Sequence, residues 1–184
     1  LDGIGAYHLT LGRNKKSVEL DLKSEEGLKL FKELVSVADV VVDNFSQGVT
    51  KRLGIDHQTL KKVNPKIITC SISGFGDTEV NRPAYDNLIQ GYAGAMSITG
   101  TDKENPVKSG IPIADLGAGL YAVIGILSAI QSREKNDSGE HVDISMLDTQ
   151  VSLLTYMATM HFLSGENPEP IGNQHMNHVP FNSY

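Results

Sequence analysis

The stretch VVVDNFSQGVTKRLGIDHQTLKKVNPKIITCSI, residues 40–72, decides the fold of this chain. It begins with a β-branched run at 40–42, typical of a buried strand, which ends in a polar loop at 43–48. Asp56 then stands where it can cap a short helix that an Asn-Pro pair stops. A second apolar run at 66–72 predicts another strand. Strand, helix and strand in this order are typical of a parallel sheet with a right-handed crossover.

The same alternation of elements continues on both sides of this stretch. Ser17–Leu22 alternates apolar and polar residues and predicts a strand, and Ser24 is placed to cap the helix that follows. Downstream, helical spacing covers 85–96, a strand-like run covers 141–146 and another helical segment covers 147–163. We therefore expect an α/β fold, with a Rossmann-like parallel sheet, flanking helices and then long helices.

Composition excludes several classes of protein. Of 184 residues, 40% are hydrophobic, which is enough for a core, and the net charge of −6 argues against nucleic acid as a main partner. Cys70 is the single cysteine, so we expect no disulfide framework and no thiolate metal cluster. We find no signal peptide and no continuous apolar run of 18 residues, so we expect a soluble protein that does not bind membranes. His175 and His178 are three residues apart, but no acid lies close, and we expect no metal site.

Both ends of the chain look cut. It opens at Leu1 without an initiator Met and stops at Tyr184, in a segment that leads toward another element. We therefore expect an internal fragment of a longer protein, in which part of any function depends on segments outside this sequence.

One acidic residue, Asp115, lies between a short apolar run and a long apolar helix. The segment Pro112–Gly119 leads into apolar residues from 120 to 130, whose periodicity needs no acid at this place. An Asp in the first turn can cap the helix by accepting hydrogen bonds from free backbone N–H groups, and the helix dipole would keep it ionised. A carboxylate nucleophile must also be ionised and partly buried. From these residues alone, a plain cap and a nucleophile both remain open.

Two loops are expected at one edge of the sheet. The polar loop at 43–48 and the loop Ser73–Gly76 each follow a predicted strand. In open parallel sheets, ligands bind outside the carboxyl ends of the strands. Gly74 and Gly76 would let a ligand approach the backbone closely, although an ordinary loop explains two glycines as well.

Several further segments occur in a fixed order along the chain. They are Gly12–Ser17, Leu20–Lys23, Ala38–Phe45, Asn64–Ile68, Ser71–Gly76, Arg82–Asp86, Ile98–Gly100, Pro112–Gly119 and Gly139–Asp143. Together, with near-constant spacing over nearly the whole chain, they resemble the class III CoA-transferase family. That family includes formyl-CoA transferase, carnitine CoA-transferase and the α-methylacyl-CoA racemases. The resemblance implies the class III CoA-transferase fold, truncated at both ends.

The resemblance also implies a division of the chain and a reaction. Residues 1–113 would form a Rossmann-like CoA-binding region that lacks its first strand–helix unit. Residues 114–184 would form the catalytic-Asp helix, a strand–helix pair and the start of a linker to a second domain. Asp115 falls where family members carry the catalytic aspartate, which forms a mixed anhydride and then an aspartyl-CoA thioester. No permanently bound cofactor is implied, because coenzyme A enters with the acyl-CoA substrate.

A CoA-binding set follows from the resemblance in three parts of the chain. The adenine end of CoA would be held by Leu20, Asp21, Leu22 and Lys23. The loop that lines the CoA site would be formed by Asn44, Phe45 and Ser46, and the phosphates would be contacted by Arg52. The pantetheine and thioester would be flanked by Pro83, Ala84, Tyr85 and Asp86. An ordinary structural role stays open for each of these positions.

Tyr85 separates two branches of the family. Racemases resemble this sequence with His at position 85, and histidine shuttles protons near neutral pH whereas a phenol does not. We therefore expect a CoA-transferase, with an α-methylacyl-CoA racemase or an inactive CoA-binding fragment as alternatives. The expected partners are an acyl-CoA and a carboxylic acid. The resemblance implies a homodimer whose full-length chains interlock. We expect the protein in the cytoplasm, with mitochondria as the alternative, because a chain with one cysteine suits a reducing compartment.

Overall fold

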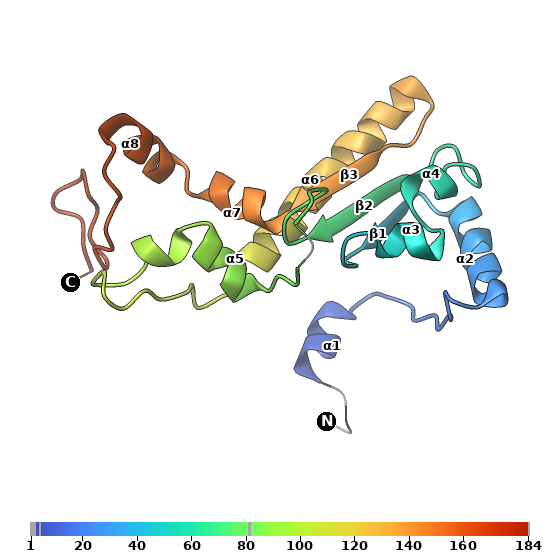
Figure 1. The fold of residues 1–184 in the computed structure, drawn as a ribbon, viewed down its shortest axis with the longest axis horizontal. Helices are drawn as coiled ribbons and strands as arrows, with labels where there is room; N and C mark the ends of the chain where they lie inside the picture. The colour runs from blue at the N-terminus through green and yellow to red at the C-terminus, as the bar shows by residue number, and fades with distance from the viewer. Residues whose placement is uncertain (1–2, 4, 81, 184) are drawn as a thin grey trace.

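The computed structural model describes residues 3, 5–80 and 82–183. It shows an elongated α/β molecule with a three-stranded sheet in the middle (Figure 1). The strands are β1 (Val40–Asp43), β2 (Ile68–Ser73) and β3 (His141–Ser145). The helices are α1 (Ala6–Leu11), α2 (Glu25–Val37), α3 (Val49–Leu53), α4 (His57–Leu60), α5 (Asp86–Tyr92), the 3-10 helix η1 (Ala95–Ile98), α6 (Ile113–Asn136), α7 (Met146–Leu153) and α8 (Tyr156–Ser164).

All three strands run parallel, in the spatial order β1, β2, β3. Val40 pairs with Ile68 at the start of the first ladder, and Ser73 pairs with Ser145 at the end of the second. Because parallel neighbours need a long connection, the chain passes through α5 and α6 before it enters β3. The three predicted strands that begin near residues 40, 66 and 141 are confirmed, and so is the predicted α/β class.

Two hydrophobic clusters pack against the sheet. One lies on the side of β1, where α2, α3 and α4 gather in Figure 1. Its buried members are Val35, Ile55, Leu60 and Ile67. The other joins the end of β2 to α5, α6 and α7, and its buried members are Phe75, Ile89, Ala114, Ala118 and Met146. Burial of each large aliphatic side chain contributes roughly 1.5–3 kcal/mol to the stability of the fold. The two clusters therefore stabilise the sheet on the side of β1 and at the end of β2.

Two predicted helix caps are confirmed. Ser24 Oγ accepts a hydrogen bond from the Gly27 N–H at 3.0 Å, where α2 begins. Asp56 Oδ1 accepts one from the Thr59 N–H at 3.2 Å, where α4 begins. Burial alone would raise the pKa of Asp56, but its hydrogen bonds with Thr59 outweigh this effect and lower that pKa.

Three predicted elements differ from the structure. Ser17–Leu22 is not a strand, because its backbone pairs with no described strand and a strand needs a neighbour to satisfy its backbone groups. The predicted helix at 85–96 divides at Gly94, whose positive φ of 80° separates α5 from η1. The predicted helix at 147–163 divides into α7 and α8 at Thr155, where φ is 50° and ψ is −123°.

Helix α6 is apolar over most of its circumference. Its exposed side chains include Leu120, Ile124 and Leu127, and its buried ones include Ala118 and Ala122. Among the described residues, α6 is the one helix that is long and apolar enough to cross a membrane by length and composition. This criterion concerns the mean hydropathy of a segment, and it differs from the continuous apolar run that the sequence lacks, because Asp115 and Ser128 interrupt the run. A core helix meets the same criterion, and α6 contacts β2, β3, α5 and α7.

Candidate active site

The loop after β1 is fixed beside the end of β2. Asn44 Nδ2 donates a hydrogen bond to the Ile72 carbonyl at 2.6 Å. The Phe45 N–H donates to Asp43 Oδ1 at 3.1 Å, and the Ser71 hydroxyl donates to Asp43 Oδ2 at 2.7 Å. These contacts join the carboxyl ends of two neighbouring strands, which is where ligands of open parallel sheets bind.

The end of β2 is held closely against the segment that precedes α5. A Cβ on Gly74 would lie 2.1 Å from the Ala84 Cβ, so only glycine allows this packing. The Gly76 N–H donates to Ser73 Oγ at 3.0 Å, which closes the loop. At Gly74, the close approach that the sequence predicts for a ligand is therefore made by the protein's own Ala84.

These segments surround a cavity of about 180 Å³, which we call the strand-end cavity. Its lining brings together two groups of predicted CoA-binding residues, namely Asn44, Phe45 and Ser46 with Pro83, Ala84 and Tyr85. The lining is completed by Gln47, Ser73, Gly74, Phe75, Gly76, Val80 and Arg82. Tyr85 is 68% exposed, so a ligand can reach its phenol.

Asp86 closes the N-terminus of α6 from another helix. α6 begins at Ile113 after Pro112, whose side chain cannot accept a hydrogen bond. Asp86 Oδ1 accepts the N–H of Ala114 at 2.9 Å and the N–H of Asp115 at 3.3 Å. These are the groups that an N-cap side chain normally satisfies. The alternative that Asp115 is a plain cap of this helix is therefore wrong, because Asp115 lies in the first turn and Asp86 supplies the cap.

A buried amide holds Asp86 in this position. Gln90, which is 1% exposed, donates from Nε2 to Asp86 Oδ2 at 2.6 Å. Gln90 Oε1 in turn accepts the Ser109 N–H at 2.8 Å. Both carboxylate oxygens of Asp86 are thus engaged within the protein. Asp86 links the cavity-lining Tyr85, its neighbour in the chain, to the backbone of Asp115.

The Asp115 side chain is exposed in the first turn of α6. Partial burial of the carboxyl, first, and the nearby Asp86 carboxylate, second, raise the pKa of Asp115. Both effects act against the helix N-terminus, which we expect to favour the ionised form of Asp115. Asp115 does not line the strand-end cavity and is joined to it through Asp86.

The remaining predicted residues lie outside the strand-end cavity. Leu20–Lys23 precede α2, and only Leu22 among them packs against the cluster beside β1. Arg52 is exposed on α3, and its Nη1 lies 3.3 Å from the point that a Cβ on Gly48 would occupy. The assignment of these residues to CoA stays a prediction, as does the division of the chain at residue 113.

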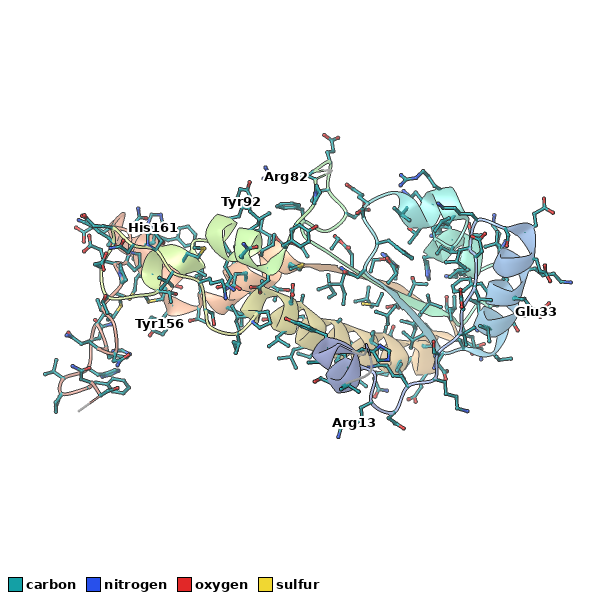
Figure 2. All side chains as sticks on the ribbon, turned by 90° about the horizontal axis from the view of Figure 1, so that it is seen from below. Arg13, Glu33, Arg82, Tyr92, Tyr156 and His161 are labelled. Atoms are coloured by element: carbon teal, nitrogen blue, oxygen red, sulfur yellow. The ribbon has the colours of Figure 1, made fainter. Side chains whose placement is uncertain are left out.

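Arg82 lines the strand-end cavity, although the sequence assigns no role to it. Its Cζ lies 4.5 Å from the Tyr92 ring centroid and 5.2 Å from the Phe75 ring centroid. Figure 2 shows Arg82 directly beside Tyr92. Arg82 belongs to the Arg82–Asp86 segment on which the resemblance rests, which is the available sequence signal. Its contact with two rings depends on tertiary structure and is invisible in the sequence.

A second cavity, of about 290 Å³, adjoins the first at Phe45–Gln47 and lies over one face of the sheet. In its lining, Thr69 Oγ1 lies 2.9 Å from His57 Nδ1 and 2.8 Å from His141 Nδ1. Burial, first, and the neighbouring His141 lower the pKa of His57. Across residues 3, 5–80 and 82–183, no group of three or more His, Cys, Asp or Glu is arranged to hold a metal ion.

The geometry defines a class of protein. It is an α/β protein with a parallel sheet, a cavity at the carboxyl ends of its strands and an acidic residue in the first turn of the adjoining helix. Over residues 1–184, the chain matches the family described as CoA-transferase family III. The chain belongs to that family, and the resemblance read from the sequence is confirmed.

The relatives whose names state an activity are CoA-transferases. The succinate–glutarate CoA-transferase of Agrobacterium fabrum is 38% identical over 178 residues, which cover 96% of this chain and 44% of that protein. The acetyl-CoA:oxalate CoA-transferase of Acetobacter aceti is 37% identical over 181 residues, which cover 97% of this chain and 46% of that protein. A crystal structure of a CAIB/BAIF family protein from Brucella suis superposes with a TM-score of 0.86 at 40% identity, over 91% of this chain and 45% of that chain. The chain thus spans about half the length of the curated relatives that it matches.

Proposed function

We propose that this chain carries the CoA-binding cavity and the nucleophile of a CoA-transferase, which moves CoA from an acyl-CoA to a free carboxylic acid. One observation carries the proposal. Asp86 accepts the backbone N–H of Asp115 at 3.3 Å and directly follows the segment Pro83–Tyr85 that lines the cavity. Family membership and the relatives named as CoA-transferases support CoA transfer in general.

In the proposed reaction, an oxygen of ionised Asp115 attacks the thioester carbonyl carbon, the C–S bond breaks and CoA leaves as the thiolate. The thiolate then attacks the aspartyl carbonyl of the mixed anhydride, which releases the first acid and leaves an aspartyl-CoA thioester. A second carboxylate attacks this thioester, expels the thiolate and forms a new anhydride. The thiolate finally attacks the incoming acyl carbon, which gives the new acyl-CoA and restores Asp115.

The surroundings of Asp115 suit this sequence of steps. A carboxyl whose pKa is raised is a more basic carboxylate once ionised, and basicity favours attack on a carbonyl. Each step exchanges one activated acyl bond for another, so the chemistry needs no ATP. The work left for the protein is to orient the partners and to stabilise the oxyanions that form.

The direct test replaces Asp115 by Asn in the full-length protein and follows CoA exchange between acyl-CoA donors and free acids by mass spectrometry. An amide cannot form the anhydride, so we expect kcat to fall by roughly 10³-fold or more. Asp148→Asn is the matched control, because Asp148 is also an exposed acid in the first turn of a helix. Full transfer activity in Asp115→Asn would remove the nucleophile assignment.

Tyr85 favours transfer over racemisation, because a racemase needs proton-transfer groups on both sides of the α-carbon. The full-length protein should therefore exchange CoA without exchanging the α-proton of an acyl-CoA in deuterated water. Rapid α-proton exchange without CoA transfer would assign a racemase instead.

A further inference from the structure

Arg82 gives the strand-end cavity a positive charge that its lining does not balance. Among the described residues that line this cavity, Arg82 is the one cation and there is no acid. The ion pairs found in the described part of the chain do not include Arg82. A cation of this kind in a concave site favours an anionic ligand.

Two aromatic rings fix the guanidinium of Arg82 at the cavity. The rings of Phe75 and Tyr92 meet edge to face, with centroids 6.0 Å apart and an interplanar angle of 69°. The Arg82 Cζ lies over both rings, at 5.2 Å and 4.5 Å from their centroids. An arginine held over aromatic faces keeps its N–H donors in the guanidinium plane, where they form the bidentate fork that matches a carboxylate.

The segment that carries Arg82 is tied to both the sheet and the α6 N-terminus. Ala84 packs directly on Gly74 at the end of β2. Asp86 binds the backbone of Asp115. A ligand group held by Arg82 therefore has a defined position relative to the proposed nucleophile.

We propose that Arg82 binds the second carboxylate of a dicarboxylic acid and so selects dicarboxylates over monocarboxylates in CoA transfer. The inference rests on the proposed function, which leaves the acid open. One planar cation in a cavity of about 180 Å³ matches one carboxylate.

The kinetic test uses the full-length protein and chain-matched acceptors, succinate against butyrate and glutarate against valerate, with one acyl-CoA donor. We expect Arg82→Gln to lower the ratio of kcat/KM for the dicarboxylate to that for the monocarboxylate by roughly 10- to 100-fold, mainly through KM for the dicarboxylate. Arg82→Lys, which keeps the charge but loses the planar fork, should recover part of the ratio. Lys29→Gln, at an exposed cation on α2, is the control that should leave the ratio unchanged.

A binding test separates this inference from the proposed function. Calorimetric titration of glutarate and valerate into the CoA-loaded protein needs no turnover. We expect tighter binding of glutarate in the parent and loss of that preference in Arg82→Gln. Absence of CoA transfer in the parent, with this preference intact, would overturn the proposed function and leave the role of Arg82 standing.

Two outcomes would overturn the role of Arg82. In the first, Arg82→Gln has the thermal unfolding midpoint of the parent and leaves unchanged both the kcat/KM ratio and the preference for binding glutarate over valerate. In the second, Arg82→Gln raises the dissociation constant of free CoA by the same factor as the KM for the dicarboxylate. That result would assign Arg82 to a CoA phosphate.

Discussion

At the residue scale, two acids with different roles meet at the start of α6. Asp86 caps the helix, and Asp115 is the proposed nucleophile. Pro112 cannot cap the helix, so the acceptor comes from Asp86, 29 residues before Asp115 in the chain. Asp115 is left with its carboxyl exposed and with a second negative charge nearby. Partial burial, first, and the charge of the residue that positions Asp115, second, therefore raise its pKa.

This arrangement predicts a change in the pH profile when Asp86 is replaced by Asn. The nucleophile must be ionised, so activity is lost as the pH falls through the raised pKa of Asp115. Removing the Asp86 charge lowers that pKa, and the acid limb of kcat/KM should move to lower pH. The loss of a charge-assisted cap should also cost about 1 kcal/mol of stability.

The control for this experiment is Asp102→Asn, at an exposed acid in the loop before α6. It should leave the acid limb in place. An unshifted acid limb in Asp86→Asn, measured over the same pH range, would contradict the electrostatic coupling of the two carboxyls.

The sequence predicts which residues form the site better than it predicts the contacts that those residues make. Asn44 and Tyr85 lie at element ends that the pattern predicts, because Asn44 follows the first strand and Tyr85 begins a helix. The role of Asp86 depends on Ala114, 28 residues further along the chain, and the role of Arg82 depends on the loop that brings it over the Phe75 ring. Local periodicity carries no information about such contacts.

At the element scale, α6 packs on the sheet through a glycine. A Cβ on Gly125 would lie 2.6 Å from Val142 Cγ1, and the branched Val142 side chain has little freedom to move away. A Cβ on Gly119, in the same helix, would meet nothing within 4 Å. The two positions share a helix and differ in whether β3 presses against them.

Alanine substitutions at these two glycines should therefore have opposite effects on the free energy of unfolding. Gly119→Ala should stabilise the protein by up to about 1 kcal/mol, which is the helix propensity gained. In Gly125→Ala the overpacking, about 1–3 kcal/mol, outweighs the same gain and should destabilise. Urea unfolding of both variants checks this, and equal midpoints would show that α6 does not rest on β3 as described.

The pattern of apolar residues correctly predicts the strands that pair with another strand of this chain. The β-branched and apolar runs at 40–42 and 66–72 became β1 and β2 because each has the other as a neighbour. Ser17–Leu22 has the same alternation but no ladder partner, and it is irregular. The apolar spacing at 147–163 is continuous, but the backbone turns at Thr155, where φ is positive. Threonine rarely adopts this conformation, so the sequence gives no signal for the turn.

At the scale of the whole molecule, α6 leaves much of its apolar surface uncovered. Leu120, Ile124 and Leu127 are 67%, 59% and 60% exposed. Apolar side chains gathered on one helix are typical of a surface that another part of an assembly covers. The homodimer implied by the family resemblance is a proposal that this surface supports, and the cytoplasmic location remains a proposal as well.

We therefore predict that the full-length protein is a dimer in solution. Light scattering across a tenfold range of concentration should give twice the mass of one chain throughout. A mass of one chain over the whole range would contradict the prediction.

The central claim is that Asp115 carries the acyl group and then CoA during transfer, and trapping tests it most directly. The full-length protein is mixed with an acyl-CoA, quenched with hydroxylamine, digested and examined by peptide mass spectrometry. The account predicts a hydroxamate on Asp115 that forms only when the acyl-CoA is present. CoA transfer that proceeds with Asp115 unmodified, or with the hydroxamate on another acid such as Asp86, would contradict it.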